Sequence, residues 1–258
     1  MQKEKIEILK DIALQAGEMI QEGFKASKEL HFKGTVDIVT QYDVAVEKFV
    51  MGELQKHFTE YTLIGEESHS GEYIYPKAIY IDPIDGTTNF VHGIPHVALS
   101  IGVWEDNTPQ MAVVYNPLLN ELFWAVKGEG AYLNEKQISV SMQTSLQQSL
   151  IATGFPYAKV KKGVEYHWVI ETMANILPNI RDIRRLGAAA LDLCYLAQGK
   201  IDAFYEIDLK PWDVAGGILI VQEAGGEVDH GIGDKLMVAT NGKITQELKQ
   251  YLAKIEEI

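Results

Sequence analysis

The side chains best suited to chemistry gather at the end of one apolar run. In AIYIDPIDGTTNF, residues 78–90, apolar residues lead into Asp82, Pro83 and Asp85. Pro83 fixes its own φ and removes a backbone donor, so a turn here would bring the two carboxylates together beside the Ile84 carbonyl. Hard oxygen ligands of this kind are the ones that Mg²⁺ prefers.

The residues that follow are suited to binding an anion. Gly86 permits a close or left-handed backbone approach, and Thr87 and Thr88 are N-cap candidates for a short helix. Free N–H groups at a helix start bind phosphate, so the segment predicts a Mg²⁺–phosphate site. The alternative is a plain turn, because Asp-Pro and Asp-Gly are common turn dipeptides. No cluster rich in histidine or cysteine favours zinc.

Two other segments offer acidic ligands for the same site. Glu66 and Glu67 stand just after the apolar run TLIG, and Asp213 lies two residues after Pro211, which suits the first position of a helix. Each has an alternative interpretation. A Glu-Glu pair is usually a solvated surface feature, and an Asp in a first helical turn complements the helix dipole.

Composition narrows the class of protein. The chain has 258 residues, of which 47% are apolar and 23% charged, as in ordinary globular proteins. Its formal net charge of −13 argues against general nucleic-acid binding. The single cysteine, Cys194, cannot form an internal disulfide, so we expect a cytoplasmic location and a buried role for this thiol. We expect no signal peptide, no membrane span and no membrane partner.

Hydrophobic periodicity predicts the elements that position these residues. Apolar residues at helical spacing from Ile6 to Phe24 predict a long amphipathic helix, and a second helix follows Thr40. TLIG and AIYI are typical of strands, and residues 97–126 predict an antiparallel meander.

In the second half, strands and helices alternate, with helices expected over residues 162–176 and 243–255. Small residues after Asp213 predict a helix that lies close to its neighbours. The alternation favours a partly parallel sheet covered on both faces. We expect one compact domain over residues 1–258, with an antiparallel-sheet half over about 1–145 and a mixed parallel α/β half over about 146–258.

Four motifs together resemble the inositol monophosphatase family of Mg²⁺-dependent, lithium-sensitive phosphatases. They are KGTVDIVTQYD at 33–43, GEES at 65–68, DPIDGTTNF at 82–90 and PWDVAGG at 211–217. The similarity runs from the first helix to EAGG near residue 226. It implies an α/β (α+β) fold, a layered αβαβα sandwich of the inositol monophosphatase and fructose-1,6-bisphosphatase type. It also implies a homodimer, for which residues 155–190 are the expected interface.

The resemblance further implies two to three Mg²⁺ ions per site. Glu66, Asp82 and the Ile84 carbonyl match the ligands of a first ion. Asp82, Asp85 and Asp213 match those of a second, and Glu66 matches a ligand of a third. Charge counting supports this scheme, because about four carboxylates in one cleft would repel one another without cations.

The other matched residues are implied to handle water and substrate. Asp43 and Thr87, with Glu66, match the group that orients the attacking water. The residues implied to contact the substrate are Asp85, Gly86, Thr87, Gly187, Ala189 and Glu206. Lys33 and Glu67 lie in matching motifs without an assigned role.

We therefore expect a phosphoric monoester hydrolase that releases phosphate from a small polyol phosphate, with myo-inositol 1-phosphate as first choice. Fructose-1,6-bisphosphate and histidinol phosphate are alternative substrates for the same site. Two other classes stay open: a non-catalytic regulatory protein with the same fold, and a glycoside hydrolase that uses paired carboxylates.

Overall fold

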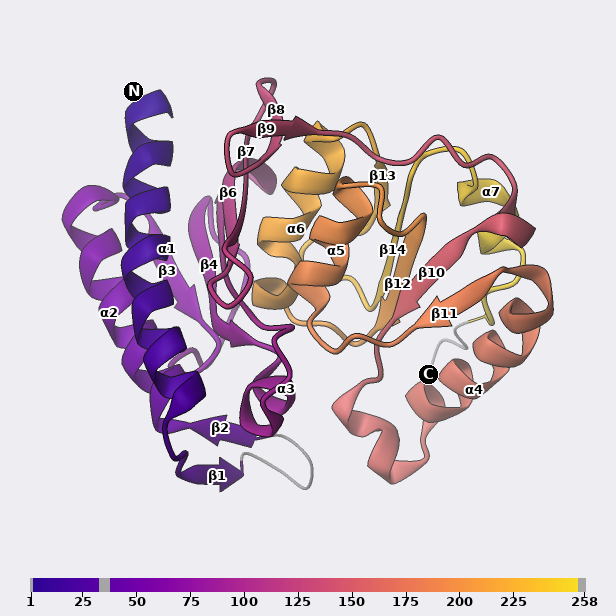
Figure 1. The fold of residues 1–258 in the computed structure, drawn as a ribbon, viewed down its shortest axis with the longest axis horizontal. Helices are drawn as coiled ribbons and strands as arrows, with labels where there is room; N and C mark the ends of the chain where they lie inside the picture. The colour runs from indigo at the N-terminus through magenta and orange to yellow at the C-terminus, as the bar shows by residue number, and fades with distance from the viewer. Residues whose placement is uncertain (1, 33–37, 255–258) are drawn as a thin grey trace.

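Two β-sheets form the framework of the computed structural model, which describes residues 2–32 and 38–254 (Figure 1). The larger sheet has seven strands in the order β3-β4-β5-β6-β7-β8-β9. Its neighbours are antiparallel except β3 and β4, which run parallel. The meander predicted over residues 97–126 is confirmed. The strands are β3 (Thr62–Gly65), β4 (Lys77–Asp85), β5 (Ala98–Glu105), β6 (Thr108–Asn116), β7 (Glu121–Val126), β8 (Gly130–Leu133) and β9 (Lys136–Ile138).

The smaller sheet has five strands in the order β11-β10-β12-β14-β13. Strand β10 runs parallel to β11 and β12, whereas β14 runs antiparallel to β12 and β13. The partly parallel sheet predicted for the second half is therefore confirmed. The strands are β10 (Leu150–Thr153), β11 (Asp182–Arg184), β12 (Ala203–Ile207), β13 (Glu227–Asp229) and β14 (Leu236–Thr240).

Helices other than α3 lie in three layers separated by these sheets (Figure 1). Helices α1 and α2 cover the outer face of the larger sheet, α5 and α6 lie between the sheets, and α4 and α7 cover the outer face of the smaller sheet. This order confirms the expected αβαβα sandwich. The helices are α1 (Gln2–Lys25), α2 (Gln41–His57), α3 (Thr87–His92), α4 (Val164–Ile176), α5 (Ala189–Ala197), α6 (Pro211–Glu223) and α7 (Thr245–Lys249).

Side-chain alternation along the strands produces the three apolar cores between the layers. In β4, Ile79 and Ile81 pack in the core under α1 and α2, whereas Tyr80 packs in the core that contains α5 and α6. In β12, Phe204 belongs to that central core and Tyr205 to the one under α4. Successive strand residues point to opposite faces, so a strand covered on both sides is apolar throughout.

Helix α6 lies very close to its neighbours, as its small residues predict. A Cβ on Gly216 would lie 2.8 Å from Ser100 Oγ, and one on Gly217 would lie 2.5 Å from Leu193 Cδ1. Larger residues would force the helix away from both the larger sheet and α5. The close contact therefore fixes the start of α6, which carries Asp213.

The last helix is shorter than predicted. A helix was expected over residues 243–255, of which 255 lies outside the described residues, but α7 covers only Thr245–Lys249. The following chain bonds to α4 instead. The Ala253 N–H donates to Thr172 Oγ1 at 3.0 Å, and Trp168 Nε1 donates to the Ala253 carbonyl at 2.9 Å. These tertiary bonds occupy backbone groups that a longer helix would use for itself, so the prediction is wrong here.

A separate two-stranded antiparallel sheet joins β1 (Leu30–Phe32) to β2 (Ile38–Thr40). Lys33 lies outside the described residues. Cys194 is buried, as predicted. In the part of the chain that the structure describes, no helix is long and apolar enough to cross a bilayer.

Candidate active site

A bulge at the end of β4 places two acids on one side of the strand. Asp82 pairs with Ser100 of β5 and Asp85 with Ala98, so one strand spans three residues where the other spans two. Residues three apart in a regular strand point to opposite faces, and the extra residue reverses this. Pro83 occupies the bulge, where no ladder donor is needed. The Ile84 N–H donates to Asp82 Oδ1 at 3.1 Å and fixes the turn.

Gly86 makes the sharp connection from β4 to α3. Its φ is +89°, and a Cβ there would lie 2.9 Å from the His96 carbonyl and 3.2 Å from the Gly187 carbonyl. Only glycine fits this left-handed, crowded position without strain. The N-cap is Gly86, so the prediction that Thr87 or Thr88 caps this helix is wrong.

Thr87 is the first residue of α3, and its hydroxyl is used in another way. Thr87 Oγ1 lies 3.1 Å from both Asp43 Oδ1 and the Ile84 carbonyl, either of which can accept its hydrogen. A hydroxyl that donates to one acceptor keeps lone pairs that can accept from water. This geometry suits the expected water-orienting role, which stays a prediction.

Asp43 is buried in the first turn of α2. Its Oδ2 accepts hydrogen bonds from the Thr40 N–H at 2.8 Å and from Thr40 Oγ1 at 2.5 Å, in a capping box that starts the helix. Burial raises the pKa of Asp43, while the bonds from Thr40 and Thr87 oppose the shift. The carboxyl is thereby held rigidly beside Thr87.

Glu66 follows the end of β3 and is the third acid of the cluster that contains Asp82 and Asp85. Its N–H donates to the Ile81 carbonyl of β4 at 3.1 Å, which extends the parallel pairing of the two strands. Glu66 lies close enough to Asp82 to raise its pKa. Two carboxylates so close together repel each other, and a proton or a cation between them would relieve the repulsion.

Asp213 comes from a third segment, the first turn of α6. Pro211 is the first residue of that helix, as predicted. Asp213 Oδ2 accepts a hydrogen bond from the Lys210 N–H at 2.7 Å. The alternative interpretation, that Asp213 stabilises the start of the helix, is therefore confirmed. Asp213 also lies close enough to Asp82 to raise its pKa. The same residue therefore both starts the helix and joins the acidic cluster.

Three acids of the cluster, Asp82, Asp85 and Asp213, have raised pKa values. Burial raises the pKa of Asp82 well above its ordinary value, and Glu66, Asp85 and Asp213 add to the shift. Burial raises the pKa of Asp85 to about 7, although the Ala190 N–H, which donates to its Oδ2 at 2.7 Å, opposes the shift. The pKa of Asp213 is raised by burial first and by Glu66 second. Buried like charges of this kind require protons or cations.

The donor set fits Mg²⁺ in chemistry and charge. Carboxylate oxygens and one carbonyl are hard ligands of the kind that Mg²⁺ prefers, and three of the carboxyl groups are buried with raised pKa values. Within residues 2–32 and 38–254, no group of three or more acidic, histidine or cysteine side chains is arranged so that it could hold a metal ion. The fit of these residues to Mg²⁺ is therefore a fit of ligand chemistry and charge.

The loop before α5 lies beside Asp85. Asn89 Nδ2 donates to the His96 and Leu186 carbonyls, each at 2.8 Å, and so ties this loop to α3. Gly187 has a φ of +98°, and Ala189 begins α5. The structure therefore places the two predicted substrate contacts, Gly187 and Ala189, next to the acidic cluster.

Glu206 of β12 is buried on the other side of the site. Burial raises its pKa well above the ordinary value, Asp213 adds to the shift, and Arg185 opposes it. A Cβ on Gly154 would overlap the Glu206 carboxyl group, so that carboxyl group lies directly on the backbone of the neighbouring strand end. The expected contact with substrate hydroxyls stays a prediction.

Sequence reasoning missed two polar residues near the site. Asn89 lies within a quoted motif, but its bridging role depends on the Leu186 carbonyl, which belongs to a segment 97 positions away. Glu47 is 3% exposed and accepts a hydrogen bond from the backbone of Glu67. Its spacing of four residues from Asp43, which puts both acids on one helix face, was the available signal.

Comparison with known proteins gives one consistent family. The model of the "Inositol monophosphatase family" matches residues 1–257. "Inositol monophosphatase 3" of Solanum lycopersicum is 42% identical over 228 residues, covering 86% of this chain and 84% of that protein. "Nus factor SuhB" of Pasteurella multocida is 40% identical over 219 residues, covering 84% of this chain and 81% of that protein.

Solved structures agree with this result. The Thermotoga maritima IMPase superposes with a TM-score of 0.86 at 30% identity, covering 98% of this chain and 97% of that one. Since coverage is nearly complete in both directions, the likeness extends to all five layers.

Proposed function

Because the chain belongs to the inositol monophosphatase family and is a phosphatase of that family, we propose that it hydrolyses a small polyol phosphate monoester, first of all myo-inositol 1-phosphate. One observation carries the proposal: Glu66, Asp85 and Asp213, which together with Asp82 come from three distant segments, lie close enough to Asp82 to raise its pKa. Burying like charges together costs free energy, which bound divalent ions would offset. The position of these acids beside the start of α3 suits ions that lie next to a phosphate.

Two to three Mg²⁺ ions would be held by the acids named above. Glu66, Asp82 and the Ile84 carbonyl would bind one ion, and Asp82, Asp85 and Asp213 a second, with Asp82 shared. Glu66 would also contribute to a third. When bound, Mg²⁺ lowers the pKa of a ligated water and withdraws charge from the phosphoryl group.

The protein's own residues would orient the water and the ester. Thr87 Oγ1 donates a hydrogen bond to Asp43 and would accept one from the attacking water. The water would then point a lone pair at phosphorus. Glu66 and Asp43 would take up the proton, since the pKa of Asp43 is already raised by burial. The backbone N–H groups of Gly86 and Thr87 would donate to the phosphate oxygens, with Asp85 alongside.

The polyol would lie between Glu206 and the loop that contains Gly187 and Ala189. A carboxylate accepts hydrogen bonds from neighbouring hydroxyls, which favours inositol among the expected substrates. Fructose-1,6-bisphosphate and histidinol phosphate would use the same acids and differ in these contacts.

A panel of phosphate esters tests the proposal. Released phosphate is measured for the three candidate esters with Mg²⁺, with EDTA, and with Mg²⁺ restored. We expect turnover only with Mg²⁺, and fastest for myo-inositol 1-phosphate. Turnover that survives EDTA would overturn the metal mechanism. A slower rate for myo-inositol 1-phosphate than for both other esters would overturn the proposed substrate.

A regulatory role is a second candidate, because relatives about 40% identical are named Nus factor SuhB. The four gathered acids argue against a purely non-catalytic protein. We also propose a cytoplasmic homodimer. The expected interface, residues 155–190, carries exposed apolar side chains, which support the homodimer. They are Tyr157, Val160, Ile170 and Leu177.

A further inference from the structure

Helix α2 presents two buried acids one turn apart. Asp43 is 1% exposed and Glu47 is 3% exposed. Residues four apart lie on the same helix face, so both acids point from α2 toward the end of the larger sheet. Asp43 contacts Thr87, as described above. Glu47 has no part in the proposed chemistry, although burying a carboxylate is costly unless it is bonded.

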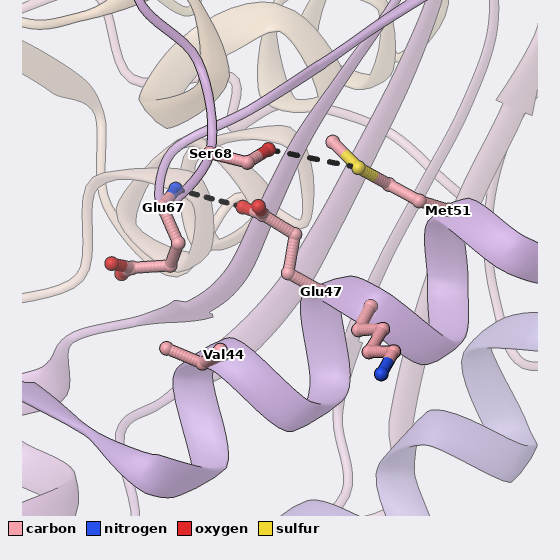
Figure 2. A pocket seen from close by; sticks show the side chains of 6 residues that line it. Val44, Glu47, Met51, Glu67 and Ser68 are labelled. Carbon is pink, nitrogen blue, oxygen red and sulfur yellow. Dashed lines mark hydrogen bonds between the residues drawn. The ribbon is translucent and has the colours of Figure 1, made fainter.

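Glu47 bonds to the backbone of the loop that carries Glu66. Its Oε2 accepts a hydrogen bond from the Glu67 N–H at 2.8 Å. In Figure 2 the Glu47 side chain extends from α2 to this nitrogen, while the Glu67 side chain points away from it. The Glu66 N–H itself donates to the Ile81 carbonyl of β4 at 3.1 Å. The peptide groups on both sides of Glu66 are therefore fixed, one by β4 and the other by Glu47.

The end of β3 is shaped to admit this carboxylate. A Cβ on Gly65 would overlap Glu47 Oε2 and would lie 2.5 Å from Met51 Cε. The side-chain-free position lets Glu47 lie directly against the backbone that leads into Glu66. Any larger residue at 65 would move Glu47 away from the Glu67 nitrogen.

Few side-chain contacts join the loop to α2 on this side, and one of them is a weak bond from Ser68 Oγ to Met51 Sδ at 3.7 Å (Figure 2). A cavity of about 280 Å³ separates the loop from the helix there, which is many times the volume of one methyl group. Its lining residues are Val44, Glu47, Lys48, Met51, Glu67 and Ser68 (Figure 2). Beside this open space, the bond from Glu47 at 2.8 Å is a stronger link between α2 and the loop than the contact of Ser68 with the Met51 sulfur at 3.7 Å.

We infer that Glu47 is a positioning residue that sets the ion-binding geometry of Glu66 through the Glu67 N–H. The inference rests on the proposed function, because Glu66 is an ion ligand only under that proposal. Groups that orient metal ligands from behind commonly change metal affinity by about 10- to 100-fold when they are lost. Through Asp43 and Glu47, α2 would then brace both the water-orienting Thr87 and the ligand Glu66.

Three substitutions separate the reach of Glu47 from its charge. Glu47→Gln keeps an oxygen that can accept the Glu67 N–H but loses the charge. Glu47→Asp keeps the charge but is one methylene too short to reach. Glu47→Ala loses both. Binding of Mn²⁺ is measured by electron paramagnetic resonance, Mg²⁺ binding by calorimetry, and protection of the Glu67 amide by hydrogen exchange.

We expect Glu47→Asp and Glu47→Ala to weaken ion binding by about 10-fold or more and to speed exchange of the Glu67 amide. Glu47→Gln should stay within about threefold of the wild type, because a charged acceptor strengthens a hydrogen bond only about twofold over a neutral one. Glu53→Gln is the matched control: Glu53 lies on the same helix, is 30% exposed and pairs with Lys56 at 2.6 Å. It should bind ions like the wild type.

Wild-type ion affinity in Glu47→Asp, or equal losses in Glu47→Gln and Glu47→Ala, would overturn the inference. Urea unfolding in EDTA identifies a variant that is not folded; if Glu47→Ala is such a variant, the Gln and Asp pair decides. The two proposals fail separately. A wild-type protein that binds Mn²⁺ through this site but releases no phosphate would refute the proposed phosphatase function and would leave the positioning role of Glu47 standing.

Discussion

Thr87 Oγ1, at the start of α3, lies 3.1 Å from Asp43 Oδ1 in the first turn of α2. The two residues are 44 positions apart in sequence. This contact joins the short helix after the acidic strand end to the layer that covers the outer face of the larger sheet. A hydroxyl held between a carboxylate and the Ile84 carbonyl has a fixed orientation, so it can act on a water in only one direction.

Removal of the Thr87 hydroxyl should slow turnover without releasing the metal. For Thr87→Ala we expect kcat to fall by about 100-fold, the lower end of what one positioned proton-transfer group contributes. The Mg²⁺ concentration for half-maximal rate should change by less than about threefold. Steady-state phosphate release over a Mg²⁺ titration measures both quantities.

Two variants control this experiment. Thr87→Ser keeps the hydroxyl and should recover most of the rate. Thr88→Ala alters the exposed neighbour in the same helix and should leave the rate unchanged. A Thr87→Ala protein with normal kcat and weakened Mg²⁺ affinity would show that Thr87 serves the metal site instead of the water.

Neutralising Asp213 should have opposite effects on activity and on stability. Asp213→Asn removes one expected ligand, so Mg²⁺-dependent turnover should fall below about 1% of the wild type. The same change removes a negative charge that raises the pKa of Asp82. In EDTA at pH 7 the variant should therefore be more stable, by about 1 kcal/mol, the free energy of one pKa unit.

Urea unfolding in EDTA and phosphate release in Mg²⁺ measure the two effects on the same preparations. Asp234→Asn, in an exposed turn far along the chain, is the control and should alter neither by much. An Asp213→Asn protein that keeps wild-type rates at saturating Mg²⁺ would contradict the second ion site.

Much of this site follows from local sequence, and the remainder depends on tertiary register. The strand before Asp82 and the helix start at Pro211 could be predicted, because periodicity and turn residues are local signals. The order of layers was implied by the family resemblance. The bulge that turns Asp82 and Asp85 to the same side could not, since it exists only relative to Ser100 and Ala98 on β5.

The missed residues share one cause. Asn89 and Glu47 act through backbone groups of segments far from them in sequence, and any residue supplies such a group. No side-chain pattern marks a backbone partner. The error at the last helix is similar, because Thr172 and Trp168 bond to the chain that was expected to be helical.

The acidic cluster predicts a pH dependence for the metal-free protein. The pKa of Asp85 is raised to about 7 by burial, and the pKa values of Asp82 and Asp213 are raised well above the ordinary value of 3.8. Between pH 4 and pH 7 the folded state therefore binds more protons than the unfolded state. The stability that these groups contribute is fully present below their ordinary pKa of 3.8 and is lost as pH rises through their folded pKa values.

Urea unfolding in EDTA at several values between pH 5 and pH 8 measures this slope. Saturating Mg²⁺ should flatten it, because bound cations replace the protons, and Asp85→Asn in EDTA should reduce it. A metal-free protein whose stability rises steadily from pH 5 to pH 8 would show that the acids are not clustered in solution.

A side chain at Gly86 should damage both the fold and the site. The φ of +89° disfavours any L-residue, and a Cβ would lie 2.9 Å from the His96 carbonyl and 3.2 Å from the Gly187 carbonyl. For Gly86→Ala we expect a loss of about 1–3 kcal/mol in the free energy of unfolding, the usual cost of a strained backbone position. To relieve this contact, α3 and Thr87 with it would move away from Asp43, so kcat should fall even at temperatures where the protein is fully folded.

Gly93→Ala is the control that separates backbone strain from the position of Thr87. The φ of Gly93 is +72°, but a Cβ there meets nothing within 4 Å. The Gly93→Ala protein should lose stability through strain alone and keep its kcat. A Gly86→Ala protein with the same stability loss and an unchanged kcat would show that the crowding at Gly86 does not set the position of Thr87.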